Sequence, residues 1–211
     1  FSLPAQSASS SPWYEQDFEK ILNSEIITAT RSQTSIKNAP GVTTVFTSED
    51  IKRMGLRSIK ELLERTTGFF INRQFTGASI GSRGILADTD QFLLLVDGHN
   101  MNSIVSKGMG DNFLFPGLEH VKQVEIIRGP GSTLWGSDAS LGIIHIITKD
   151  GKDIDGLKAT ANYSDNDRAR HFNLQFGEII TDDIQVMASF TAAESEGFDI
   201  IDGFGNTLEF G

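Results

Sequence analysis

The stretch VKQVEIIRGPGSTLWGSDASLGIIHIITKD, residues 121–150, contains the elements that decide the fold. Its two apolar runs, residues 121–127 and 143–148, flank a glycine-rich segment, and both are predicted to be β-strands. The second run scarcely alternates between apolar and polar side chains, so both of its faces are expected to be covered. His145 lies within it and is expected to be a core residue whose hydrogen bonds are satisfied.

The glycine-rich segment at 129–136 superficially resembles a phosphate-binding loop. A Walker loop needs a lysine directly after its final glycine, where Ser137 stands. A dinucleotide loop opens a long helix, whereas here the next strand begins too soon. We therefore interpret the segment as a tight turn. No histidine has metal-ligand spacing and no serine lies in a nucleophile elbow, so the sequence predicts no enzyme, no cofactor and no metal site.

Strands and short helices alternate on the N-terminal side of this stretch. Residues 42–46, 69–71 and 92–96 are predicted strands. Thr47 and Gly55 bracket one short helix, and the Ser58–Glu61 capping box begins another at 58–67. Glycine-rich loops are expected at 74–84 and 102–117. The pattern predicts an α+β fold, with a small mixed sheet flanked by short helices.

From residue 156 the hydrophobic pattern changes to a period of two. The segments 156–164, 170–177 and 184–193 each place apolar side chains on one side and polar ones on the other. This alternation is typical of transmembrane β-strands, and equally of a half-solvated antiparallel sheet. The residues alone leave both readings open.

Charge separates the same two parts of the chain. Residues 152–211 hold 12 acidic and 4 basic side chains, so they carry most of the net charge of −10. No basic stripe is present that would neutralise phosphates, which argues against a nucleic-acid partner. There is no cysteine, which excludes a disulfide scaffold. No run approaches the roughly 18 apolar residues of a membrane-spanning helix.

The middle of the chain, about residues 24–150, resembles the plug domain of TonB-dependent outer-membrane receptors. Eight stretches carry the resemblance, in the order of the family: residues 27–31, 45–51, 62–63 with 67–68, 83–84, 94–98, 124–132, 135–139 and 142–149. The departures are small. His145 stands where Asn is usual, Gly81-Ser82 precedes Arg83 where Ile is expected, and His99 follows the Asp-Gly pair where Val is common.

The resemblance implies a receptor from the outer membrane of a Gram-negative bacterium. In this family the plug leads directly into a barrel of about 22 strands, so the chain is expected to be a fragment. We therefore expect a mobile N-terminal extension at 1–30, the plug at 31–152, and the first antiparallel strands of a truncated transmembrane β-barrel at 153–211.

Three groups of site residues follow from the resemblance. The box that the periplasmic energy transducer TonB captures is assigned to Glu25, Ile26, Ile27, Thr28 and Ala29, an extended segment suited to strand addition. Arg83, Glu125 and Arg128 are expected to lock the plug to the inner barrel wall. Polar residues of the apical loops are expected to contact the nutrient: Gln74, Thr76, Ser79, Asn102, Ser103, Lys107, Asp111 and Asn112.

The implied function is gated uptake of a ferric siderophore, haem or cobalamin, with TonB, the missing barrel and this metal-chelate or vitamin substrate as partners. The alternative is a soluble periplasmic binding module without transport. The segment 153–211 is also expected either to fold back on the plug or to pair with other copies of the fragment, because its apolar faces and strand edges are open.

Overall fold

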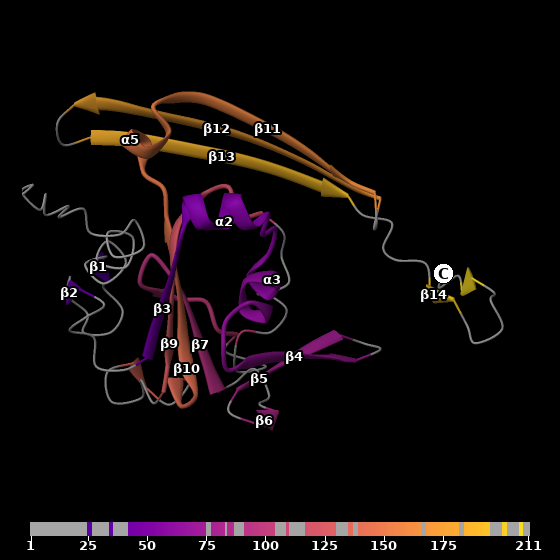
Figure 1. The fold of residues 1–211 in the computed structure, drawn as a ribbon. Helices are drawn as coiled ribbons and strands as arrows, with labels where there is room; N and C mark the ends of the chain where they lie inside the picture. The colour runs from indigo at the N-terminus through magenta and orange to yellow at the C-terminus, as the bar shows by residue number, and fades with distance from the viewer. Residues whose placement is uncertain are drawn as a thin grey trace, which may run out of the picture.

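The computed structural model describes residues 25–26, 34–35, 42–74, 77–82, 84–86, 91–103, 109, 117–129, 135–136, 139–165, 168–181, 184–194, 200–201 and 207–208. Its centre is a five-stranded sheet with the order β3-β9-β10-β7-β8 (Figure 1). The strands are β3 (Val42–Thr47), β7 (Phe92–Val96), β8 (His99–Asn100), β9 (Val121–Arg128) and β10 (Gly142–Thr148).

The two strands of residues 121–150 lie next to one another at the middle of this sheet. β10 runs antiparallel to β9, with Ile144 opposite Ile126, and parallel to β7, with Ile144 opposite Leu94. Residues 142–146 are buried without interruption, as the non-alternating run predicted. The sheet is mixed because β10 has one neighbour of each direction, which confirms the predicted sheet type.

Two short helices cover one face of the sheet. α2 (Ser48–Met54) begins at Thr47, whose side chain forms a capping box with Asp50, and ends at Gly55 in the left-handed conformation. α3 (Ile59–Glu64) begins at Ser58 and stops at Arg65, shorter than the predicted 58–67. Leu62 and Leu63 are fully buried against the sheet.

A second, three-stranded sheet corrects the expectation of a loop at 74–84. It contains β4 (Phe69–Gln74), β5 (Gly77–Ser82) and β6 (Ile85–Leu86). Glycine weakens a strand unless a neighbour fills its place. Here the Phe70 ring lies across Gly81, where an added Cβ would come within 2.0 Å of that ring. The aromatic side chain thus replaces the missing one.

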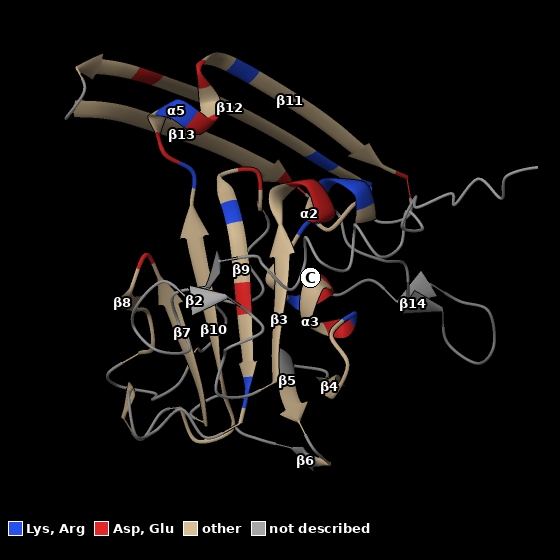
Figure 2. Cartoon of the chain, turned by 60° about the vertical axis from the view of Figure 1, so that its left-hand side comes forward, with Lys and Arg blue, Asp and Glu red and all other residues tan. Residues whose placement is uncertain are grey.

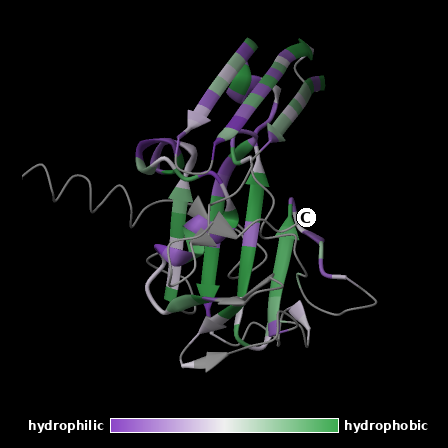
Figure 3. Ribbon diagram, turned by 90° about the vertical axis from the view of Figure 1, so that its right-hand side faces the viewer, coloured by the Kyte–Doolittle hydropathy of each residue, from purple (hydrophilic) through white to green (hydrophobic). Residues whose placement is uncertain are grey.

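The C-terminal part forms a sheet of three long antiparallel strands: β11 (Gly156–Ser164), β12 (Ala169–Thr181) and β13 (Ile184–Glu194). We call these three strands the wall. It lies across the end of the plug at which α2 and the one-turn helix α5 (Gly151–Ile154) are found (Figure 1). The alternation predicted from the sequence is visible along its strands in Figure 3.

The two faces of the wall differ in burial. On β12, Asn173 and Gln175 face the plug and are buried, whereas the alternating Phe172 and Phe176 are about two-fifths exposed. Large apolar side chains are exposed along all three strands, among them Leu157, Tyr163, Val186 and Phe190. A soluble sheet buries its apolar face, so the arrangement favours the transmembrane reading.

Two small ladders complete the described structure. β1 (Glu25–Ile26) pairs antiparallel with β2 (Thr34–Ser35), and β14 (Ile200–Ile201) with β15 (Thr207–Leu208). Within the described residues, no helix has the length and apolar character needed to cross a membrane.

The helix assignment predicts the cost of a core charge. Replacing Leu62, which is fully buried, by Asp places an unpaired carboxylate in the core. We expect Leu62→Asp to lower the free energy of unfolding of the plug by about 4 kcal/mol or more. Thr67→Asp, at an exposed position after the same helix, is the control and should change it by less than about 1 kcal/mol. Urea unfolding of both variants measures the difference, and equal stabilities would refute the packing of α3.

The exposed wall predicts self-association of this fragment. Tyr163, Phe172, Phe176 and Phe190 remain 41–64% exposed, and a three-stranded sheet has two open edges. We expect residues 1–211 to form dimers or larger species by light scattering and to bind more hydrophobic dye than a chain shortened at Gly151. Two monomeric species with equal dye binding would show instead that residues 153–211 form a soluble sheet.

Candidate functional site

A polar cluster interrupts the sheet face opposite α2 and α3. The strand register places Val45, Glu125, His145 and Leu95 in one row across β3, β9, β10 and β7. Glu125 is fully buried and His145 nearly so. The flanking row on one side contains the apolar Ile127, Ile143 and Leu93, with Thr43 at its β3 end. A carboxylate and an imidazole therefore lie together beside apolar side chains of this layer.

Hydrogen bonds fix both side chains of this cluster. The Gln123 amide donates to Glu125 Oε1 at 2.7 Å, and His145 Nδ1 lies 4.0 Å from Glu125 Oε2. His145 Nε2 accepts the Gly98 N–H at 3.0 Å, so a neutral imidazole carries its proton on Nδ1, facing Glu125. Burial lowers the pKa of His145, against the opposing effect of the Glu125 and Asp97 carboxylates. The expected satisfied core histidine is therefore found.

Arg128, at the end of β9, joins three parts of the plug. Its guanidinium donates to the Thr67 carbonyl and, at 3.2 Å, to Thr44 Oγ1 on β3. Gly68 lies beside the guanidinium, where an added Cβ would be in ordinary contact with Nη1 at 3.5 Å, and its φ of +89° favours glycine. Nε is buried without a hydrogen-bond partner. β9 thus carries charges of both signs along its length (Figure 2).

Of the three residues predicted to lock the plug to the barrel wall, the structure describes Glu125 and Arg128. Glu125 and Arg128 are three residues apart on one strand, so their side chains project from opposite faces of the sheet. Each already has partners inside the plug. Arg83 lies outside the described residues. The locking role of the three residues stays a prediction.

Four of the eight predicted nutrient contacts lie in the described part of the chain. Asn102 supports the fold: its side chain accepts the Leu94 N–H at 3.0 Å and donates to the Phe92 carbonyl at 2.9 Å, which continues the edge of β8. Ser103 follows it directly. Gln74 and Ser79 belong to strands β4 and β5. The remaining four, Thr76, Lys107, Asp111 and Asn112, lie outside the described residues.

The predicted TonB box is described at its first two residues. Glu25 lies opposite Ser35 and Ile26 opposite Thr34 in the antiparallel β1–β2 ladder. Residues 27–29 lie outside the described part of the chain. An extended backbone at Glu25 and Ile26 is the conformation that strand addition requires.

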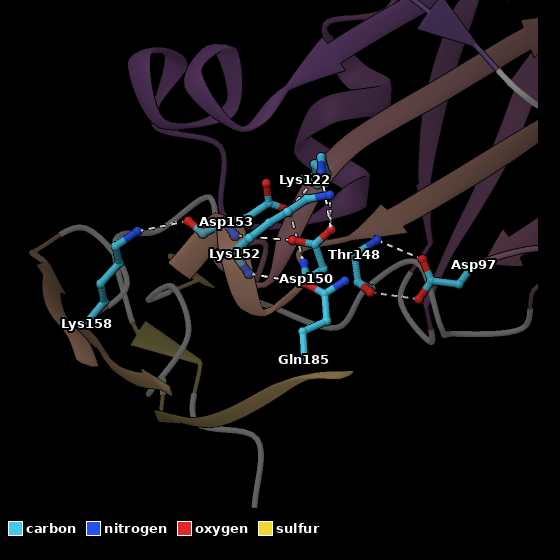
Figure 4. A network of polar contacts seen from close by, with 8 residues as sticks. All are labelled: Asp97, Lys122, Thr148, Asp150, Lys152, Asp153, Lys158 and Gln185. Carbon is cyan, nitrogen blue, oxygen red and sulfur yellow. Dashed lines mark hydrogen bonds and ion pairs between the residues drawn. The ribbon is translucent and has the colours of Figure 1, made fainter. Parts of the chain in front are cut away.

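A second polar network, which the sequence analysis missed, joins the plug to the wall (Figure 4). Lys122 Nζ lies 2.8 Å from Asp153 Oδ2 and 3.8 Å from Asp150 Oδ2. The two carboxylates form the capping box of α5, and Asp97 accepts hydrogen bonds from the backbone N–H and hydroxyl of Thr148 just before it. The Asp-x-x-Asp spacing signals the helix start in the sequence, but nothing there indicates that Lys122 would reach it.

Electrostatics at this network favour the charged forms. The hydrogen bond that Lys122 donates to the Asp153 carboxylate raises the pKa of Lys122. Burial acts to raise the pKa of Asp153, but its hydrogen bonds with Lys122 and Asp150 outweigh burial and lower the pKa. Burial lowers the pKa of nearby Lys149, whose Nζ donates to the Glu119 carbonyl at 2.6 Å. In the described part of the chain, no three metal-ligating side chains gather at this or any other place.

Comparison with known proteins identifies this architecture. The model of the TonB-dependent receptor plug domain matches residues 35–143, which contain β3, β7, β8 and β9, the first two residues of β10, and the helices α2 and α3. The chain belongs to this family. Membership confirms the resemblance seen in the sequence, the fold class, and a location in the outer membrane of Gram-negative bacteria.

Relatives of the plug are much longer proteins. A vitamin B12 transporter of Vibrio vulnificus is 28% identical over 180 residues, covering 84% of this chain and 29% of the transporter. The alcaligin outer-membrane receptor FauA of Bordetella pertussis superposes with a TM-score of 0.60 at 20% identity, covering 82% of this chain and 29% of the receptor. The ferric yersiniabactin uptake receptor FyuA of Yersinia pestis gives 0.59 at 21% identity, covering 80% and 27%. The two structures show the fold alone.

The His145 environment predicts a pH dependence of plug stability. Its folded pKa is lowered by burial, so the unfolded chain binds a proton more readily. The stability that neutral His145 provides is complete above the usual pKa of about 6.5 and is lost as the pH falls through that value towards the folded pKa. We expect His145→Asn, which keeps an acceptor near Gly98, to remove a slope of about one proton from the pH dependence of unfolding.

His99→Asn is the matched control, since His99 is exposed on β8. This variant should keep the slope of the parent. Chemical unfolding at pH values from 5 to about 7.5 measures both variants, and identical slopes for His145→Asn and the parent would contradict the assignment.

Proposed function

We propose that this chain is the plug and first wall strands of a receptor that gates TonB-dependent uptake of a scarce nutrient across the outer membrane. One observation carries the proposal: a plug of this family continues, through α5, directly into strands whose polar faces meet the plug and whose apolar faces are exposed. A soluble binding module would not leave the apolar side chains of three consecutive long strands in water.

The nutrient belongs to the class of metal chelates and metal-containing vitamins. The curated relative is a vitamin B12 transporter, and the structural relatives import ferric siderophores or related chelates. Cobalamin, a ferric siderophore and haem therefore remain the three candidates. Direct binding titrations of the complete receptor with cyanocobalamin, a ferric catecholate and haemin distinguish them. The proposed role is transport, with no enzymatic step.

TonB is the proposed energy transducer, and the proton gradient is the proposed source of the energy. In this scheme, nutrient binding at the apical loops shifts the population towards a released box, and TonB then captures it in the periplasm. Strand addition relies on main-chain hydrogen bonds, so it needs an extended segment more than particular side chains. Glu25 and Ile26, which already lie in a ladder with Thr34 and Ser35, have the required backbone conformation.

The box assignment predicts a specific sensitivity to proline. A peptide of residues 20–31 should bind the C-terminal domain of the cognate TonB, and Ile27→Pro should weaken binding about tenfold or more by removing a strand amide. Ile27→Ala keeps that amide and should bind within about threefold of the parent peptide. Isothermal calorimetry measures the three affinities, and equal values for the proline and parent peptides would exclude strand addition at this residue.

A further inference from the structure

The helix α5 packs on the wall backbone-to-backbone. At Gly177 of β12, an added Cβ would lie 2.5 Å from Ile154 Cβ and 2.6 Å from the Gly151 carbonyl oxygen. At Gly151, an added Cβ would lie 2.7 Å from the Val186 carbonyl oxygen and 2.8 Å from that of Glu178. No side chain fits at either glycine. The distance between the backbone of α5 and the backbones of β12 and β13 is therefore fixed by direct contact.

The opposite side of α5 is held by the plug sheet. Lys122 is the second residue of β9. Its ammonium group contacts Asp153 and Asp150, the two carboxylates of the α5 capping box. Lys152 also contacts Asp150, at 3.4 Å, but it belongs to α5 itself. Among these ion pairs, those of Lys122 are the ones that cross from the plug sheet to the helix.

A second contact between plug and wall lies beside the first. Glu119 Oε1, two residues before β9, is 3.4 Å from His171 Nδ1 on β12. Gly117 lies against the same place, where an added Cβ would be 3.4 Å from Thr191 Cγ2 on β13. The plug segment 117–122 thus meets the wall directly through Glu119 and Gly117, and indirectly through Lys122 and α5.

We propose that α5, held by Lys122, is the joint that fixes the β9–β10 end of the plug against β12 and β13, with Lys122 as its positioning residue. The proposal rests on the proposed function, because a gate that moves needs one part that stays attached to the barrel. Among the described residues, the ion pairs of Lys122 are with Asp150 and Asp153. Lys122 acts by keeping α5 in the one position that the two glycines allow.

The joint is tested by measuring the distance between plug and wall. The 211-residue chain has no cysteine, so nitroxide labels attach only at introduced ones. Labels at Glu49→Cys on α2 and Ala188→Cys on β13, both exposed positions, report the separation by pulsed electron resonance in detergent micelles. The labelled parent is diluted with unlabelled chain so that only distances within one chain are measured, and it should give a single narrow distance distribution.

Lys122→Met should broaden this distribution, because it removes the charge that binds Asp153 and Asp150. Methionine is chosen because its side chain is nearly as long as that of lysine. Loss of the ion pairs should raise the population outside the parent range about fivefold. Lys152→Met, which leaves the Lys122 contacts in place, should match the parent, and Lys122→Arg should restore the narrow distribution. Gly177→Ala should separate α5 from the wall by an independent route and broaden the distribution as well.

An unchanged distribution in Lys122→Met, or equal broadening in Lys152→Met, would overturn the joint. Hydrogen exchange at α3 checks that the plug remains folded in each variant; if Gly177→Ala unfolds, the three lysine variants decide. The measurement uses neither TonB nor nutrient. If the distance measurements contradict the joint while the peptide binds TonB as expected, the gating proposal stands. If the peptide fails to bind TonB while the distances behave as expected, the joint stands.

Discussion

The pairing of β9 with β10 is the constraint on which the rest of the structure depends. Seven residue pairs join the two strands, and β10 is buried on both faces along residues 142–146. Main-chain groups buried to this extent need partners, so β3 must cover the free edge of β9 and β7 that of β10. Because β7 runs parallel to β10, the chain must return from the end of β7 to the start of β10, and residues 97–141, which include β8 and β9, make this connection.

The same pairing carries charge into the centre of the sheet. Glu125 and His145 face one another from β9 and β10, on the face away from the helices. Burying either group alone is costly, and together they share the cost through hydrogen bonds with Gln123 and Gly98. Any change that slides β9 against β10 would separate them, so the polar cluster helps to define a single register.

The wall is also built of β-strands, but its two faces have different surroundings. A strand of period two offers one face to the plug and leaves the other exposed, and β12 buries Asn173 and Gln175 on the first face and leaves Phe172 and Phe176 about two-fifths exposed on the second. The chain spans about 29% of the length of one curated relative, a vitamin B12 transporter. Among the described residues, the plug and the wall meet at α5 and at the contacts of Glu119 and Gly117 with β12 and β13.

The local sequence pattern alone determined much of this protein. It predicted the buried strand at 143–148, the helix caps at Thr47 and Ser58, and the alternation from residue 156. Each of these features depends on neighbours within a few residues. The strand at 77–82 was not predicted, since Gly81 is compatible with a strand only when Phe70 lies across it. Nor was the use of Asn102 to continue a strand edge, or of Lys122 to bind α5. These depend on residues that the fold brings together from distant parts of the chain, and a side chain's partner across such a distance is decided by packing and register, which no local pattern encodes.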